Sequence, residues 1–348
     1  MSTKVISYEG IIAVESLFGA WERFQLGKKK RKDVQIFNYH LEDNIFDLHT
    51  SLKKSTYTHD KYIPFYVNDP KQRHIHKATV KDRLVHQAIY SALYPIFDPT
   101  FIFDSYSCRN DKGTHKAIQR LQVFLKKSSK NYSQNTYVLK CDINKFFASV
   151  DKDILLSIII KTIQDGKTIL LIKEVLDSFP QGLPLGNLTS QLFANVYLNE
   201  LDQYIKHDLR IKHYIRYCDD FIIVNQDKEF LLSLIVKIEG FLWHRLKLQL
   251  HPRKVILRKF SWGIDFLGYV VLPHYILPRT KTKKRLFHKL DRKMEELTRD
   301  YISYDSFNQS FQSYLGYLKH ANSFKLKQRL RNHLYFLYSN ISSKSSQI

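Results

Sequence analysis

The chain has 348 residues, of which 44% are hydrophobic, so it can bury a large core. Lysine and arginine total 55 against 33 acidic residues. The resulting formal net charge of +22 favours binding to a polyanion, and that binding should weaken with added salt. No apolar run is long enough to span a bilayer, and the first residues lack a secretory signal. We therefore expect a soluble, cytoplasmic protein without a membrane partner.

Hydrophobic periodicity predicts mainly helices at the two ends of the chain and mixed strands and helices between them. In chain order the predicted elements are helices at 13–24 and 37–52, a strand at 62–67, a helix at 79–94 closed by Pro95, a polar loop at 128–134, a strand at 138–143, helices at 152–179 and 189–206, and strands on either side of residues 216–220. Asp151 fits the N-cap of the helix at 152–179. Residues 272–274 and Pro278 mark the exit to a final helical segment, and residues 342–346 are typical of a frayed tail.

The cysteines and histidines give little sign of a site of their own. Cys108, Cys141 and Cys218 show neither disulfide pairing nor zinc spacing, and the fifteen histidines form no HExxH motif. His74 and His76 could ligate a metal, but their alternation favours a strand.

Residues 216–220 read Arg-Tyr-Cys-Asp-Asp and lie between two stretches of strand-forming residues. The pattern predicts a tight turn carrying two adjacent carboxylates, Asp219 and Asp220. Neighbouring acids oppose sheet propensity and repel each other, which a divalent cation would relieve. Because Mg²⁺ prefers one or two protein carboxylates together with substrate phosphate oxygens, the hairpin is a candidate site of phosphoryl transfer. The alternative is a solvated hairpin with an acidic loop.

A third carboxylate, Asp142, ends the predicted buried strand at 138–143. Strand-end acids from two separate segments can converge on a pair of metal ions. An N-cap role for Asp142 is the alternative, but Asp151 fits that role better. Asp142 and Asp219 would then share the ions, with Asp220 as a weaker contributor.

Six ordered blocks between about residues 35 and 320 resemble the reverse transcriptase family. They are residues 70–75, 81–88, 105–117, 142–147, 217–220 and 263–269. The resemblance implies an α+β, right-hand polymerase fold with fingers, a palm built on an antiparallel sheet, and a small helical thumb. It suggests an N-terminal helical extension at 1–60, fingers at 61–135, a palm with inserted helices at 136–275, a thumb at 276–340 and a disordered tail at 341–348.

The same resemblance implies roles for individual residues. Two Mg²⁺ ions, for which Mn²⁺ could substitute, would be held by Asp142, Ile143, Asp219 and Asp220. The incoming nucleotide would meet Lys71, Arg73, Phe146, Phe147, Leu185, Gly186 and Gln191. The primer grip would comprise Phe266, Leu267, Gly268 and Tyr269, and the nucleic-acid contacts would be Arg83, Arg109, Lys281, Lys283, Lys284 and Arg285. The alternative for the basic residues is a set of solvated helix faces.

Phe147 stands at the family's sugar-gate position, where a ring would exclude a 2′-hydroxyl and select deoxynucleotides. The alternative is a palm-core aromatic, since Phe146 and Phe147 must take different faces.

Residues 185–191 depart from the usual Gln-Gly-x-x-x-Ser-Pro of bacterial reverse transcriptases. Leu185 stands at the usual glutamine and Gln191 at the usual proline, which resembles the reverse transcriptases of diversity-generating retroelements. Gln181 and Gly182 mimic the common motif four residues out of register. In the family this loop lies against the nascent base pair, so loss of an amide there predicts altered selectivity. The resemblance further implies errors opposite template adenines.

The expected function is therefore an RNA-directed DNA polymerase that copies a template-repeat RNA into error-prone cDNA. Its partners would be the RNA template, the cDNA/primer duplex and dNTPs. No segment after the thumb suggests an endonuclease or RNase H, so we expect a polymerase that relies on partners. The family resemblance implies that one of them is a small basic accessory protein oligomer. One alternative is an antiphage-defence or retron-type reverse transcriptase. Another is a non-enzymatic, maturase-like RNA-binding protein, against which the three acids argue.

Overall fold

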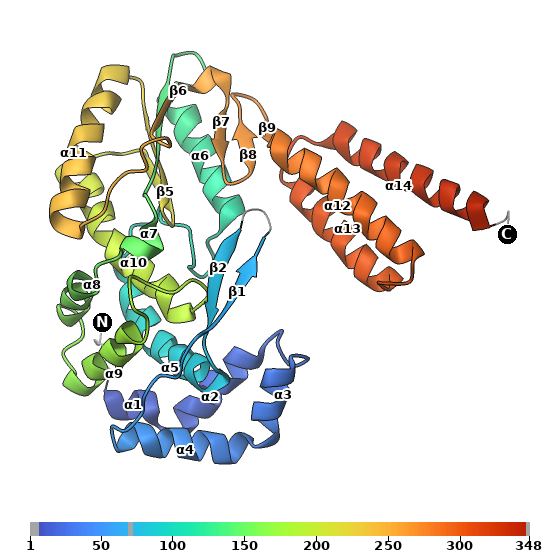
Figure 1. The fold of residues 1–348 in the computed structure, drawn as a ribbon. Coiled ribbons are helices and arrows are strands. Elements are labelled where there is room, and N and C mark those ends of the chain that lie inside the picture. Colours follow the sequence, from blue (N-terminus) through green and yellow to red (C-terminus); the bar gives the residue numbers. More distant parts are fainter. Residues whose placement is uncertain (1–6, 69–71, 346–348) are drawn as a thin grey trace. The chain divides into compact units, whose positions relative to one another are not determined.

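A computed structural model describes residues 7–68 and 72–345, with side chains as far as residue 335. The chain divides into two compact units. The first is drawn from residues 1–113, 140–222 and 232–255, and the second from 114–139, 223–231 and 256–348. Helices and strands occur in both units, which confirms the predicted α+β class (Figure 1).

The first unit begins with four helices, α1 (Tyr8–Ile12), α2 (Val14–Gln25), α3 (Lys32–Tyr39) and α4 (Leu41–Lys53). The apolar side of α2 packs against α5 (Val80–Phe97) and α4. The helix predicted at 13–24 is confirmed. The helix predicted at 37–52 is wrong in its start, because His40 leaves helical geometry (φ −116°, ψ 44°) and separates α3 from α4.

Helix α5 corrects a second prediction. Its N-cap is Thr79, whose side chain accepts from the backbone N–H of Asp82. Pro95 lies inside the helix, which continues to Phe97. A proline this close to the C-terminal end removes a hydrogen bond only from the last turns, so the helix tolerates it. A 3₁₀ turn (η1, Asp98–Thr100) follows.

Strands β1 (Ile63–Val67) and β2 (Arg73–Lys77) form an antiparallel hairpin in which Ile63 lies opposite Lys77. This confirms the predicted first strand and the strand interpretation of His74 and His76. A second sheet has the strand order β4 (Tyr214–Tyr217), β5 (Asp220–Asn225), β3 (Tyr137–Asp142) and β6 (Ile256–Lys259). Strands β3 and β5 contribute residues to both units.

The single helix predicted at 152–179 is wrong, since the chain forms α8 (Lys152–Ile160) and α9 (Gly166–Asp177). Asp151 caps α8 as predicted, accepting from two backbone N–H groups at 3.0 Å each. Asp165 caps α9 in the same way and so permits the break. The short α7 (Phe146–Ser149) precedes them. Helix α10 (Leu188–Gln203) passes into a π-helical turn (η2, Tyr204–Asp208), and α11 (Lys228–Leu246) follows the second sheet's hairpin.

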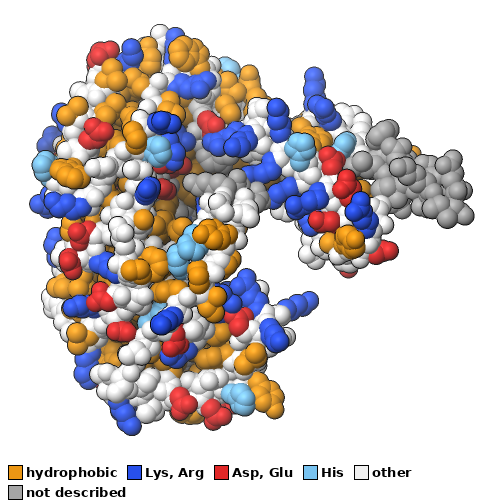
Figure 2. Space-filling model, viewed as in Figure 1, with side chains coloured by type: hydrophobic (Ala, Val, Ile, Leu, Met, Phe, Trp, Pro, Cys, Tyr) orange, Lys and Arg blue, Asp and Glu red, His pale blue; other side chains and the backbone are white. Residues whose placement is uncertain are grey.

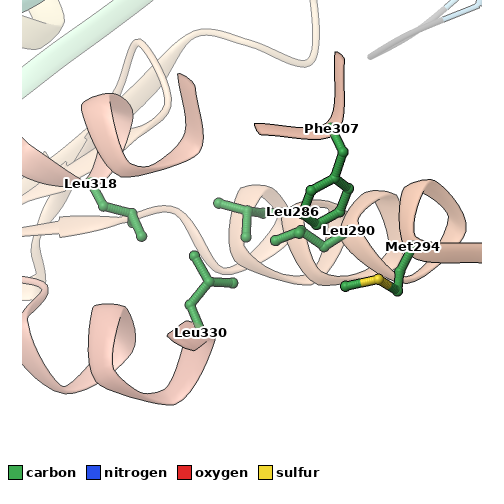
Figure 3. Close-up of a cluster of buried hydrophobic side chains, with 6 residues drawn as sticks. All are labelled: Leu286, Leu290, Met294, Phe307, Leu318 and Leu330. Atoms are coloured by element: carbon green, nitrogen blue, oxygen red, sulfur yellow. The ribbon is translucent and has the colours of Figure 1, made fainter. Parts of the chain in front are cut away.

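The second unit contains α6 (Thr114–Ser128), a 3₁₀ turn (η3, Phe260–Trp262) and a three-stranded antiparallel sheet. Its strands are β7 (Ile264–Phe266), β8 (Tyr269–Val271) and β9 (Ile276–Pro278). Helices α12 (Thr280–Thr298), α13 (Tyr304–Lys319) and α14 (Phe324–Ser345) pack around a cluster of buried apolar side chains. Figure 3 shows its members, Leu286, Leu290, Met294, Phe307, Leu318 and Leu330.

The C-terminal helix bears on the predicted tail, and the helices together bear on the predicted absence of a membrane span. Helix α14 continues to Ser345, so the tail predicted at 341–348 begins inside a helix, and its last three residues lie outside the described chain. Within the described ranges, no helix combines the length and apolar character needed to cross a membrane.

Candidate active site

The turn between β4 and β5 consists of Cys218 and Asp219. Cys218 has a positive φ of 54°, a conformation that non-glycine residues rarely adopt. The backbone N–H of Ile143 donates to the carbonyl of Asp219 at 3.2 Å. This bond places the end of β3, which carries Asp142, directly beside the turn. The two strand ends predicted to converge therefore do so.

Asp219 and Asp220 lie in an environment that disfavours their charges. Burial raises the pKa of Asp219, and the neighbouring Asp142 raises it further. Burial also raises the pKa of Asp220 to about 6; Lys140 opposes this shift, whereas the other two acids add to it. Lys254 Nζ donates to Asp142 Oδ1 at 2.8 Å, and Lys140 Nζ lies 3.8 Å from Asp220 Oδ1. The site therefore attracts positive charge.

The donor chemistry fits a divalent cation. Carboxylate oxygens are the ligands that Mg²⁺ prefers, and the ammonium group of Lys254 already takes a cation's place at Asp142. Across the part of the chain that the structure describes, however, no three His, Cys, Asp or Glu side chains are gathered closely enough to hold an ion alone. Asp142 and Asp219, with Asp220 beside them, would thus need substrate phosphate oxygens to complete the coordination.

The sequence analysis did not identify several residues that lie close to the acids. The backbone N–H of His251 donates to the carbonyl of Asp142 at 2.7 Å, and that of Asn144 donates to Gln249 at 2.9 Å. These bonds bring the segment that carries Lys254 to the acids, although it lies more than 100 residues further along the chain. No local pattern in the sequence could have paired them.

The two phenylalanines after Asp142 take different faces, as expected. Phe146 is 2% exposed, so its side chain faces the core and its predicted contact with a nucleotide is corrected. Phe147 is half-buried, and its carbonyl accepts from Leu183 N at 2.7 Å. Gly182 has a φ of 65°, and a Cβ there would lie 2.2 Å from the Phe147 carbonyl oxygen. The out-of-register glycine is therefore needed for this close approach.

Residues 185 and 186 lie against the hairpin of β1 and β2. The backbone N–H of His76 on β2 donates to the Leu185 carbonyl at 3.2 Å. Gly186 approaches Ile75 so closely that a Cβ would lie 3.1 Å from its Cγ2 atom. The Leu185 side chain is half-buried. The loop that distinguishes the predicted subtype is thus attached to strand β2.

Three other residues were predicted to contact the nucleotide, and the structure describes two of them. Arg73 is exposed on β2, and Gln191 is exposed in the first turn of α10. Lys71 lies outside the described residues.

The predicted primer grip is the hairpin between β7 and β8. Phe266 and Tyr269 are at most 1% exposed, so their side chains face the interior and the prediction that they grip a primer is corrected. Leu267 and Gly268 form the turn with φ values of 47° and 91°. The Gly268 carbonyl accepts from the Tyr317 hydroxyl at 2.6 Å. Of the four residues predicted for the primer grip, Leu267 and Gly268 are the two that are not buried.

The predicted nucleic-acid contacts fall into two groups. Arg83 Nη2 bonds Asp33 Oδ2 at 2.5 Å, and Arg109 Nε bonds Asp98 Oδ1 at 2.7 Å. Arg109 also donates to three backbone carbonyls, and its side chain is 7% exposed. The bonds and burial of Arg109 correct its assignment as a ligand contact. Arg83 is half-buried in its ion pair with Asp33, and its contact with nucleic acid stays a prediction.

The other four basic residues lie on the first turns of α12. Lys281 and Lys284 are exposed, whereas Lys283 and Arg285 are half-buried. Figure 2 shows Lys and Arg side chains along this helix, interspersed with acidic ones. Their position on a solvent-facing helix is compatible with phosphate contact.

Comparison with known proteins places the chain in a family. Residues 53–271, more than half of the chain, match the reverse transcriptase (RNA-dependent DNA polymerase) family. Protein YkfC of Escherichia coli is 24% identical over 251 residues, covering 60% of this chain and 65% of that protein. The group II intron-encoded protein LtrA of Lactococcus lactis is 25% identical over 303 residues, covering 66% of this chain and 49% of LtrA. A structure of apo telomerase from Candida tropicalis, truncated from its C-terminal domain, aligns with a TM-score of 0.47 at 12% identity, covering 69% of this chain and 60% of that one. The chain thus spans about two thirds of the length of YkfC and about half of the length of LtrA. It belongs to the reverse transcriptase family.

Proposed function

We propose that this chain is an RNA-directed DNA polymerase that makes cDNA from dNTPs on an RNA template. The observation that carries the proposal is the backbone bond from Ile143 to the Asp219 carbonyl, at 3.2 Å. It sets Asp142 and Asp219 side by side at the ends of neighbouring strands, in a chain that belongs to the reverse transcriptase family. The raised pKa values of Asp219 and Asp220 support a site built for cationic partners.

Asp142 and Asp219, assisted by Asp220, would hold the divalent ions. Reverse transcriptases use such ions, commonly Mg²⁺, and Mn²⁺ could replace it here. When bound, they supply activation of the primer 3′-hydroxyl and stabilisation of charge on the departing pyrophosphate. The protein's own contribution is to orient the carboxylates, through the bond from Ile143 to the Asp219 carbonyl. Until the ions bind, Lys254 Nζ lies 2.8 Å from Asp142 Oδ1 and neutralises the charge of that carboxylate.

Three other side chains would select the nucleotide. Phe147 is half-buried and follows Asp142 closely in the sequence, and its ring would exclude a 2′-hydroxyl by steric contact. Arg73, exposed on β2, would contact the triphosphate together with Lys71. Leu185, whose carbonyl is bonded to β2, would contact the nascent base pair without offering a hydrogen bond. We therefore propose deoxynucleotides as substrates and relaxed selectivity for the templating base.

The subtype that we propose is a diversity-generating retroelement polymerase. Its template would be a template-repeat RNA, its errors would concentrate at adenines, and a small basic accessory protein would assist it. The support is the pair of departures at Leu185, in a loop bonded to strand β2, and at Gln191, in the first turn of α10.

The test is to sequence the cDNA made by the purified chain on a defined RNA with a DNA primer, dNTPs and Mg²⁺, with and without the accessory protein. Asp219→Ala should abolish synthesis. Leu185→Gln should lower substitutions at template adenines about tenfold, because it restores a hydrogen-bonding group. Leu185→Met keeps an apolar side chain and should retain the error pattern.

Different outcomes would refute the mutagenic subtype and the assignment of the active site. Faithful cDNA from the parent would leave a polymerase but refute the mutagenic subtype, in favour of a defence or retron-type enzyme. Synthesis by Asp219→Ala equal to that of the parent would refute the assignment of the site.

A further inference from the structure

We infer that Arg216, held by Asp202, is a positioning residue that fixes the turn carrying Asp219. The inference rests on the polymerase function proposed above and concerns a residue outside the proposed metal and substrate contacts. Arg216 lies on β4 and Asp202 on α10, and both are 0% exposed. A fully buried arginine directly before a catalytic turn calls for a physical account, because buried charges are retained only where they are well paired.

The pairing itself is complete. Arg216 Nε donates to Asp202 Oδ1 at 2.8 Å, and Arg216 Nη2 donates to Asp202 Oδ2 at 2.6 Å. This two-bond fork sets the plane of the guanidinium group. The Tyr214 hydroxyl donates to the same carboxylate at 2.7 Å. Strand β4 is also held at this point, since the backbone N–H of Arg216 donates to the Asp104 carbonyl at 3.0 Å.

With the plane fixed, the remaining nitrogen of Arg216 points at the catalytic turn. Nη1 donates to the Cys218 carbonyl at 3.2 Å and to Asn195 Oδ1 at 3.1 Å. Asn195 in turn donates to the Ser107 carbonyl at 2.9 Å. The Cys218 carbonyl belongs to the peptide that joins Cys218 to Asp219, so its direction sets the orientation of the Asp219 backbone. Cys218 has a positive φ of 54°, a conformation that the surrounding contacts must maintain.

The turn is thus held from two sides. Arg216 binds the carbonyl before Asp219, and Ile143 binds the carbonyl of Asp219 itself at 3.2 Å. The second bond ties the turn to Asp142. Without the first, the peptide that joins Cys218 to Asp219 would lose its bond to Arg216 and could rotate. Since phosphoryl transfer depends on reactive groups placed to a fraction of an ångström, we expect a loss of turnover of about 10- to 100-fold.

The experiment must separate positioning from folding. Removing Arg216 alone would leave the Asp202 charge buried and unpaired, which is destabilising in itself. Replacing both partners by apolar residues avoids this, so the variant is Arg216→Met with Asp202→Leu. It is made together with Tyr214→Phe, because that hydroxyl would otherwise lose its acceptor. Tyr214→Phe alone is the matched control, since Tyr214 bonds Asp202 but not the turn.

Two readouts decide the matter. In primer extension, the triple variant should fold with a melting temperature close to that of the control, while kcat falls about 10- to 100-fold and the KM for dNTP changes less than about twofold. In metal-free protein, alkylation of Cys218 by N-ethylmaleimide should be faster than in the control, because a turn without its bond to Arg216 exposes the thiol more often. Both proteins carry Cys108→Ser for this measurement, since Cys108 is exposed and Cys141 is fully buried.

The outcomes are distinct. An inactive control would refute the proposed polymerase function, and the alkylation rates would still decide the positioning role. Equal kcat and equal alkylation in the triple variant and the control would overturn the inference. If the triple variant fails to fold, Arg216→Lys decides, because lysine keeps the charge opposite Asp202 but lacks the forked donors. Parental turnover and alkylation in Arg216→Lys would also overturn it.

Discussion

Replacement of Asp220 by asparagine should stabilise the metal-free protein at neutral pH while lowering its polymerase activity. Asp220 begins β5, and burial is the largest cause that raises its pKa to about 6. Asp142 and Asp219 add to the shift, and Lys140 reduces it. At pH 7 the folded protein therefore holds an ionised carboxylate that its surroundings disfavour. Asparagine has nearly the same shape and carries no charge.

The size of the effect follows from the shift. A rise in pKa from 3.8 to about 6 corresponds to about 3 kcal/mol at most. The Asp220 side chain is 29% exposed, so solvent screening should reduce the gain to about 1–2 kcal/mol. Between pH 3.8 and 6 the folded state binds more protons at this site than the unfolded state. The contribution of Asp220 to stability therefore falls as the pH rises through this range. The advantage of Asp220→Asn should be full above pH 6 and vanish below about pH 4.

The assay is urea unfolding of the parent and Asp220→Asn between pH 4 and 8 in the presence of a chelator. Asp47→Asn, at an exposed position on α4, is the matched control and should change little. Addition of Mg²⁺ should narrow the difference, because the ion stabilises the parent more than the variant. An Asp220→Asn protein no more stable than the parent at pH 7.5 would refute the electrostatic account of the site.

Three further substitutions test other parts of the reasoning. Gly182→Ala should lower the unfolding free energy by at least about 2 kcal/mol in urea denaturation, since its Cβ would lie 2.2 Å from the Phe147 carbonyl at a positive φ. Gly240→Ala should raise it by about 0.5–1 kcal/mol in the same assay, because this glycine lies within α11 with nothing within 4 Å of the new Cβ. Replacing Lys281 and Lys284 together by glutamine should lower the slope of log affinity against log salt for RNA by about 1.5, measured by fluorescence anisotropy. An unchanged slope would place these lysines away from the phosphates.

The sequence was sufficient for features that depend on neighbouring residues. Strand alternation and apolar flanks placed Asp142 and Asp219 at strand ends, and Asp151 was identified as the cap of α8. These features follow from backbone geometry and local hydrogen bonding, which a short window of sequence contains. Local patterns also misled in places. The apolar spacing of residues 152–179 continued through a break that the Asp165 cap stabilises, and Pro95 was tolerated near a helix end.

Only the tertiary structure decided which groups each charged or aromatic side chain meets. It paired Arg216 with Asp202 and Lys254 with Asp142, and it turned Phe146 and Tyr269 into the core. It also gave Arg83 and Arg109 carboxylate partners within the protein. The reason is physical: a buried charge is stable only when other groups neutralise it and bond to it, and a buried ring only when apolar groups pack around it. The fold supplies these partners from distant segments. The sequence by itself thus determined where the acids lie along the chain, and the tertiary structure determined what surrounds them.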